Sequence, residues 1–236
     1  MTPSGGWSGG SSIRRPPPRR DGERAPAMRA PPALGCQAAR GRIASKAVDL
    51  VSPMRVIAGI HKGKRLRSDE GLQTRPTSDR LRETLFNILA PRISAAGFLD
   101  LCAGSGAVGI EALSRGAAQA TFVEHSRRAL VALVENLARC GIGDEAELVQ
   151  RDALSAVKQF IQAKRRFDFI FCDPPYASPI YAPLLELLGA QPPLSEDGWL
   201  IVEHHAKRPV AETVGELRRF RAVQQGESTL SFFSFL

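Results

Sequence analysis

Long apolar runs are absent from this sequence of 236 residues: none is long enough to span a membrane, and the first residues lack the apolar centre of a secretory signal. Cysteine is also scarce, and the four cysteines form no C-x-x-C pair, which argues against a zinc site or a disulfide framework: Cys36, Cys102, Cys140 and Cys172. The adjacent His204 and His205 fall on a predicted strand, where they face opposite ways and cannot chelate one metal. We therefore expect a reduced, cytoplasmic protein without a metal site or a membrane segment.

Acidic residues are few in the amino-terminal part of the chain. Residues 1–53 hold nine Lys and Arg against three Asp and Glu, and residues 54–95 hold nine against four. Residues 96–236 hold fourteen against seventeen, so the formal net charge of +8 comes from the first 95 residues. Such an excess of positive charge favours contacts with phosphate groups.

The first 53 residues lack the hydrophobic periodicity of a folded segment. They are rich in Pro, Gly, Ser and Arg, as in "GGWSGGSS" and "RRPPPRR". An Arg-rich transit peptide fits the low acid content but not the many prolines. We expect residues 1–53 to be a disordered or non-native extension, because the first ordered-looking stretch opens at Met54.

Residues 54–95 predict a basic hairpin followed by a helix. The stretch "MRVIAGIHKGKRLRS" contains two short β-prone pieces around a Lys-Gly turn. The stretch "TSDRLRETLFNILA" fits a helix with Thr77 or Ser78 as its N-cap and an apolar stripe of Leu81, Leu85 and Ile88.

Residues 96–236 predict one α/β domain. Strands are expected at 97–101, 119–124, 146–152, up to Asp173 and 198–204, alternating with helices at 107–115, 126–140, 153–163 and about 180–189. This alternation indicates a doubly wound, mostly parallel sheet. The tail "RRFRAVQQGESTLSFFSFL" instead predicts two antiparallel strands joined at Gly226.

Acidic residues end four successive predicted strands: Asp100, Glu124, Asp152 and Asp173. Ligands of such sheets bind beyond the carboxyl ends of the strands. The first strand runs into "CAGSGAVG", whose glycines, Gly104, Gly106 and Gly109, have G-x-G-x-x-G spacing before a helix. Carboxylates gathered at one edge repel each other unless a ligand uses them, so this edge is the candidate site.

The sequence "CDPPY", residues 172–176, follows the apolar run "FDFIF". Prolines stop a strand and stiffen the chain, so this loop fixes the carboxylate of Asp173, the carbonyl of Pro174 and the ring of Tyr176 at one strand end. A nicotinamide or flavin dinucleotide also fits the glycine spacing, but it explains neither "DPPY" nor Asp100 before the glycines. A sulfonium nucleoside accounts for more of the pattern.

These motifs resemble the class I methyltransferases, in the branch that methylates amino groups and carries Asp or Asn, Pro, Pro and an aromatic residue in its fourth motif. In addition, "MRVIAGIHKGKRL" and "TRPTSDRLRETLFNIL" are similar to the amino-terminal signature of the RsmD-like guanine-N2 methyltransferases of 16S ribosomal RNA. The resemblance extends from Met54 to the carboxyl terminus. It implies a Rossmann-like fold, S-adenosylmethionine (SAM) as cofactor, and a monomer that acts on the rRNA of an assembled or partly assembled small subunit.

The resemblance also assigns roles to residues. The catalytic set is Asp173, Pro174 and Tyr176, and the SAM-binding set is Asp100, Gly104, Gly106, Glu124, Asp152 and Ala153. The RNA-binding set follows instead from the excess of positive charge between residues 54 and 95, and we expect it to be Lys62, Lys64, Arg65, Arg67, Arg75 and Arg80. Two alternatives remain open: the same chemistry on DNA adenine or a protein glutamine, and a non-catalytic RNA-binding assembly factor, against which an intact Asp173 argues.

Overall fold

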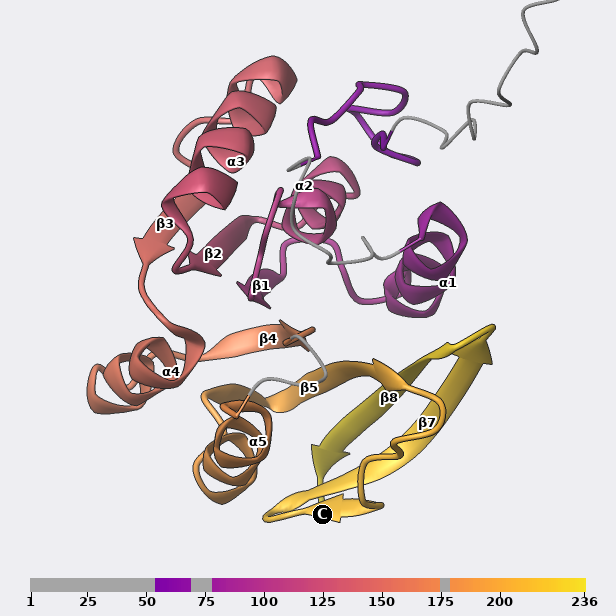
Figure 1. The fold of residues 1–236 in the computed structure, drawn as a ribbon, viewed down its shortest axis with the longest axis vertical. Helices are drawn as coiled ribbons and strands as arrows, with labels where there is room; N and C mark the ends of the chain where they lie inside the picture. Colours follow the sequence, from indigo (N-terminus) through magenta and orange to yellow (C-terminus); the bar gives the residue numbers. More distant parts are fainter. Residues whose placement is uncertain (1–53, 69–77, 175–178) are drawn as a thin grey trace, which may run out of the picture. The chain divides into compact units, whose positions relative to one another are not determined.

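The computed structural model describes residues 54–68, 78–174 and 179–236, all within one compact unit, Leu50–Leu236 (Figure 1). Its helices are α1 (Asp79–Leu89), α2 (Ala107–Ser114), α3 (Arg127–Cys140), α4 (Ala153–Gln162) and α5 (Tyr181–Ala190). Its strands are β1 (Gly97–Leu101), β2 (Gln119–Glu124), β3 (Ala146–Gln150), β4 (Phe167–Cys172), β5 (Leu194–His205), β6 (Thr213–Val214), β7 (Leu217–Gln225) and β8 (Ser228–Phe235). Within these ranges no helix has the length and apolar character needed to cross a membrane.

The strands form one sheet in the order β3-β2-β1-β4-β5-β8-β7-β6. The first five of these are parallel neighbours, and β8, β7 and β6 continue the sheet in antiparallel pairing. Gly226, with a φ of +60°, lies in the turn between β7 and β8. The predicted doubly wound, Rossmann-like α/β fold with an antiparallel finish is confirmed.

Helices cover both faces of the sheet (Figure 1). Buried side chains of α1, α2 and α3 share one core with Phe98, Phe122, Phe171 and Ile201 of the strands. Buried side chains of α4 and α5 share a second core with the intervening strand residues, including Leu99, Leu101, Val123, Ile170, Leu200 and Val202. The alternation follows from the period of two along a strand. The same alternation determines on which face of the sheet the side chains at the strand ends project.

The predicted hairpin after Met54 is shorter than expected. Its two β pieces reduce to a single antiparallel bridge between Arg55 and Arg65, with Gly63 at a φ of +83° in the turn. Val56 and Leu66 are buried in the core beneath α1–α3. Residues 54–68 are therefore packed on the sheet and share its core.

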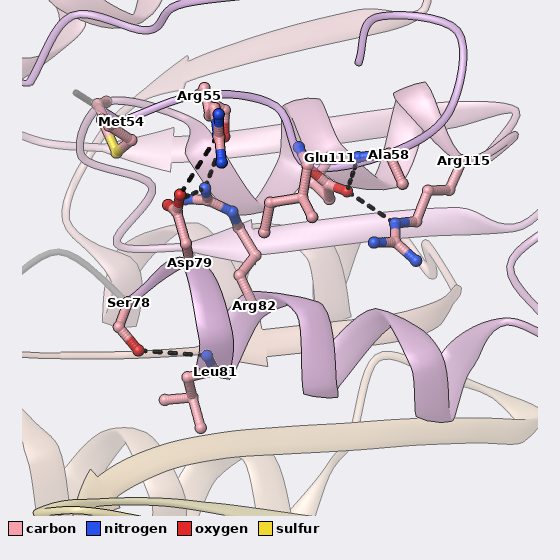
Figure 2. Close-up of polar contacts among 11 residues, drawn as sticks. Met54, Arg55, Ala58, Ser78, Asp79, Leu81, Arg82, Glu111 and Arg115 are labelled. Carbon is pink, nitrogen blue, oxygen red and sulfur yellow. Dashed lines mark hydrogen bonds and ion pairs between the residues drawn. The ribbon is translucent and has the colours of Figure 1, made fainter. Parts of the chain in front are cut away.

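Two charged residues that the sequence did not single out hold this segment in place (Figure 2). Glu111 of α2 is fully buried and accepts hydrogen bonds from the backbone N–H groups of Ile57 (2.7 Å) and Ala58 (3.0 Å), and from Arg115 Nε (2.7 Å). Arg82 of α1 is also fully buried, and its Nη2 donates to the carbonyl of Arg55 (2.7 Å) and to Asp79 (2.9 Å). Burying a charge is costly unless it is paired, so both contacts tie the segment firmly to α1 and α2.

Two predicted boundaries were wrong. The third strand ends at Gln150, and Asp152 is the N-cap of α4, where its side chain accepts from Ser155 N at 2.9 Å. The fifth strand begins at Leu194, four residues before the predicted start at 198. For α1 the N-cap is Ser78, which accepts from Leu81 N at 3.2 Å, as one of the two predicted alternatives.

Candidate active site

The strand ends bring a row of carboxylates to one level of the sheet. Leu101 of β1 pairs with Val123 of β2 and with Cys172 of β4, and Cys172 pairs with Val202 of β5. The residues that follow on β2, β4 and β5 are Glu124, Asp173 and Glu203. By alternation they belong to the face covered by α1–α3, and Asp100 lies one pleat earlier on the same face.

The carboxylates in this row influence one another's protonation. Burial raises the pKa of Asp173 well above its usual value, and the nearby charges of Glu203 and Asp100 raise it further. Burial also raises the pKa of Asp100 to about 7, the hydrogen bond from Gly109 N opposes that rise, and the charge of Glu124 adds to it. Such a site favours a ligand that carries a positive charge or several hydrogen-bond donors.

The three glycines of the loop after β1 serve different purposes. A Cβ on Gly106 would lie 2.1 Å from Leu133 of α3, and one on Gly109 would lie 2.2 Å from Phe122 of β2, so these two allow close packing within the protein. Gly104 has a φ of +54°, and no described atom lies within 4 Å of the position that its Cβ would take. Gly104 therefore leaves an open surface at the sheet edge where a ligand can approach the backbone.

Two of the carboxylates fix this loop. Asp100 Oδ2 accepts from Gly109 N at 2.9 Å, beneath the start of α2. The two oxygens of Glu124 accept from Gly104 N at 2.8 Å and from Ser126 N at 2.7 Å. Each carboxylate oxygen has a second lone pair, so Glu124 can hold the loop and still accept a hydrogen bond from a ligand.

Asp152 and Ala153 lie at the next position along the sheet edge. Arg151 N donates to the carbonyl of Glu124 at 3.2 Å, which places the start of α4 beside the end of β2. The side chain of Asp152 is exposed, whereas Ala153 is buried in the core beneath α4 and α5. The backbone hydrogen bond from Ser155 lowers the pKa of Asp152, so this carboxylate differs electrostatically from the buried ones.

The basic segment 54–68 meets the glycine loop at both of its ends. Met54 Sδ accepts from Ser105 Oγ at 3.7 Å, and Asn136 Nδ2 donates to the carbonyls of Ser105 and Arg67, both at 2.9 Å. Asn136 is fully buried, and its Oδ1 accepts from Arg67 N at 2.7 Å. The segment therefore lies at the same edge as the carboxylate row.

The predicted RNA-binding residues fall into three groups. Lys64 Nζ donates to the carbonyl of Cys140 at the end of α3 (2.7 Å), and Arg67 pairs with Glu135 (2.7 Å). Lys62, Arg65 and Arg80 are exposed, and Lys62 and Arg80 line a cavity of about 370 Å³ together with Arg55, Asp79 and Glu83. Arg75 lies outside the described residues, as do Pro175 and Tyr176 of the "DPPY" loop.

Glu203 is the member of the row that the sequence prediction missed. It follows the apolar run "WLIV" of β5, just as Asp173 follows that of β4, and its side chain is 3% exposed. An acid after an apolar strand is the signal that identified the other members, and it was present in the fifth strand as well.

Neutralising Asp173 should stabilise the protein. Because its pKa is raised in the folded state, its charge opposes folding at any pH well above about 3.9, the value in an unfolded chain. We expect Asp173→Asn to raise the free energy of urea-induced unfolding at pH 8 by on the order of 1 kcal/mol, and the gain to vanish near pH 3.5. The exposed Asp144→Asn is the matched control and should change neither value. A loss of stability at pH 8 would mean that the row is not electrostatically crowded.

Comparisons with known proteins agree with this geometry. The family model described as "Conserved hypothetical protein 95" matches residues 54–234. YlbH of Bacillus subtilis (strain 168) is 36% identical over 180 residues, covering 76% of this chain and 98% of that protein. "Ribosomal RNA small subunit methyltransferase D" of Escherichia coli (strain K12) is 40% identical over 150 residues, covering 64% of this chain and 71% of that one.

A solved structure is similar over the same region. The yhhF protein of Escherichia coli superposes with a TM-score of 0.67 and 32% identity, covering 78% of this chain and 98% of that one. The sheet order, the glycine loop and the acid before "PPY" thus occur in a chain whose residues 54–234 match the family model. The chain belongs to the conserved hypothetical protein 95 family, the RsmD-like methyltransferases.

Proposed function

We propose that this protein transfers a methyl group from SAM to the exocyclic N2 amino group of a guanine in the 16S rRNA of the small ribosomal subunit. The observation that carries the proposal is the position of Asp173 in the carboxylate row, at the same edge of the sheet as the open backbone of Gly104, in a chain that is 40% identical over 150 residues to an rRNA small subunit methyltransferase. A cytoplasmic monomer acting on an assembled or partly assembled subunit fits this activity.

The residues at the sheet edge fit the chemistry of SAM. Gly104 offers open backbone for the methionyl part, and Glu124 keeps lone pairs for ribose hydroxyls. The carboxylates of the row suit a cationic ligand, and Asp152 with Ala153 stands next to Glu124 for the adenine. SAM, when bound, supplies an electrophilic methyl group on a sulfonium centre.

The protein's own part in the reaction is to prepare a weak nucleophile. An exocyclic amino nitrogen is a poor nucleophile because its lone pair is delocalised into the ring. Hydrogen bonds from this amino group to the Asp173 carboxylate and the Pro174 carbonyl direct the lone pair outward. They also offset the positive charge that develops on the nitrogen. Tyr176 is assigned the stacking contact with a base flipped out of its surroundings.

The basic segment supports capture of RNA at this edge. A row of carboxylates repels phosphates, so positive charge beside it is needed for RNA to approach. Lys62, Arg65 and Arg80 are exposed and available for phosphate contacts. Lys64 and Arg67 make contacts inside the protein, and their share of RNA binding is therefore proposed to be smaller.

The activity is tested by transfer of labelled methyl from SAM to small ribosomal subunits, naked rRNA and DNA, followed by nucleoside analysis. We expect N2-methylguanosine in subunit rRNA. The Asp173→Ala variant should be at least about a hundredfold slower, with nearly unchanged SAM affinity, because it lacks a preorganised acceptor at developing charge. N6-methyladenosine, or label in DNA only, would contradict the proposed substrate. Near-normal turnover of the variant would mean that "DPPY" only ends the strand and takes no part in catalysis.

RNA binding by the basic segment is tested through the salt dependence of affinity. The triple variant Lys62→Ala, Arg65→Ala, Arg80→Ala should bind rRNA fragments more weakly at low salt. Its slope of log K against log salt should be shallower by about 0.7 for each phosphate that the variant no longer neutralises. The matched control removes three exposed charges on the α4 side of the sheet, Lys158, Lys164 and Arg166. Parallel slopes for the wild type and the first variant would exclude these residues from the RNA-binding surface.

A further inference from the structure

We propose that Glu203 reads the target base, by accepting a hydrogen bond from N1–H of the guanine whose N2 amino group is held by Asp173. This assignment rests on the proposed guanine-N2 methyltransferase activity and adds a specificity-determining residue to that site. It extends the site to β5, beyond the strand that carries "DPPY".

The sheet register places Glu203 beside Asp173. Cys172 pairs with Val202 in parallel, so the two acids that follow occupy neighbouring strands at one level, where strands lie about 4.8 Å apart. Ile201 belongs to the core beneath α1–α3, and alternation directs Glu203 to that same face. On the other side Glu203 pairs with Leu230 of β8, which is buried in the same core.

Glu203 lies where solvent is largely excluded, as is expected of a residue that contacts a base. The side chain is 3% exposed, and its cross-strand partner Leu230 belongs to the buried core beneath α1–α3. The charge of Glu203 raises the pKa of Asp173 after the effect of burial, which agrees with the short distance between the two carboxylates that the register implies. A carboxylate has about four lone-pair sites, so a hydrogen bond to a base is compatible with contacts inside the protein.

The hydrogen-bonding pattern of guanine matches two adjacent acceptors. Its Watson–Crick edge presents N1–H and the N2 amino group side by side, and both are donors. In adenine, the ring nitrogen next to the reactive amino group is N1, an acceptor, which a carboxylate would repel. Asp173 alone accepts from any amino group, whereas the pair Asp173 and Glu203 favours guanine. An acceptor that a substrate analogue cannot satisfy is the usual source of strong discrimination against that analogue.

A second explanation of the same arrangement is that Glu203 only adjusts the protonation of Asp173. The two explanations differ in their dependence on the base. If Glu203 acts only through Asp173, replacing it slows methylation equally for every base with a 2-amino group. If Glu203 accepts a hydrogen bond from N1–H, replacing it removes a contact with guanine but none with a base whose N1 carries no hydrogen.

The test compares guanine with 2-aminopurine at the methylated position, identified beforehand by mapping the wild-type product. 2-Aminopurine keeps the 2-amino group but has a bare N1 and no O6. We expect the wild type to methylate it at least about a hundredfold more slowly than guanine in kcat/KM. Equal rates for the two bases would overturn the inference without the use of any variant.

The Glu203→Gln variant supplies the second arm, because an amide can donate to a bare N1. Its amide oxygen can still accept from guanine N1–H but without the negative charge, so the variant should be slower on guanine and should narrow or invert the preference, with 2-aminopurine within about threefold of guanine or better. The missing O6 affects both enzymes alike and cannot produce this change. A variant that is slowed equally on both bases would overturn the inference. Glu203 would then act only by adjusting the protonation of Asp173. Absence of N2-methylguanosine from the wild type on ordinary subunits would overturn the proposed function itself.

Discussion

The mutual repulsion of carboxylates at the end of the sheet is the constraint on which the rest of the site depends. Glu124, Asp173 and Glu203 lie at one level, with Asp100 just below, and burial raises the pKa of Asp100 and Asp173. This arrangement does not favour stability, because buried carboxylates so close together repel one another. The backbone N–H groups of Gly104, Ser126 and Gly109 offset part of the cost, and these bonds also shape the glycine loop.

The amino-terminal segment, residues 54–68, places positive charge at the same edge of the sheet as the carboxylate row. Residues 54–68 are held at the same edge by the buried side chains of Glu111, Arg82 and Asn136. Because Asn136 bonds both Ser105 and Arg67, the basic segment and the glycine loop share one anchor. In the proposed activity, a cationic cofactor and a polyanionic RNA therefore meet surfaces of opposite sign that are fixed relative to each other.

The sequence was most informative where a pattern repeats along the chain. Alternating strands and helices indicated the fold, and the glycine spacing with Asp100, Glu124 and Asp173 indicated the edge at which the site lies. Individual side chains were harder to place. Arg82 and Glu111 resemble surface charges in sequence, and only the packing of residues 54–68 reveals that they are buried. Lys64 likewise differs from Lys62 only through the carbonyl of Cys140, 76 residues away along the chain. Asp152 was assigned to a strand because a capping aspartate and a strand-end aspartate occupy the same place in the pattern.

Proton release on binding of SAM tests the role of the carboxylate row most directly. At pH 6.5 a carboxyl with a pKa of about 7, such as Asp100, is largely protonated in the free protein, and a cation bound beside it lowers that pKa. The amino group of SAM remains charged at this pH. Calorimetry in buffers of different ionisation enthalpy should therefore detect protons released by the protein, with affinity rising as the pH passes through 7 and with less release from Asp100→Asn. Binding without proton exchange, and with the same affinity at pH 6 and pH 7, would contradict a cation-binding carboxylate row.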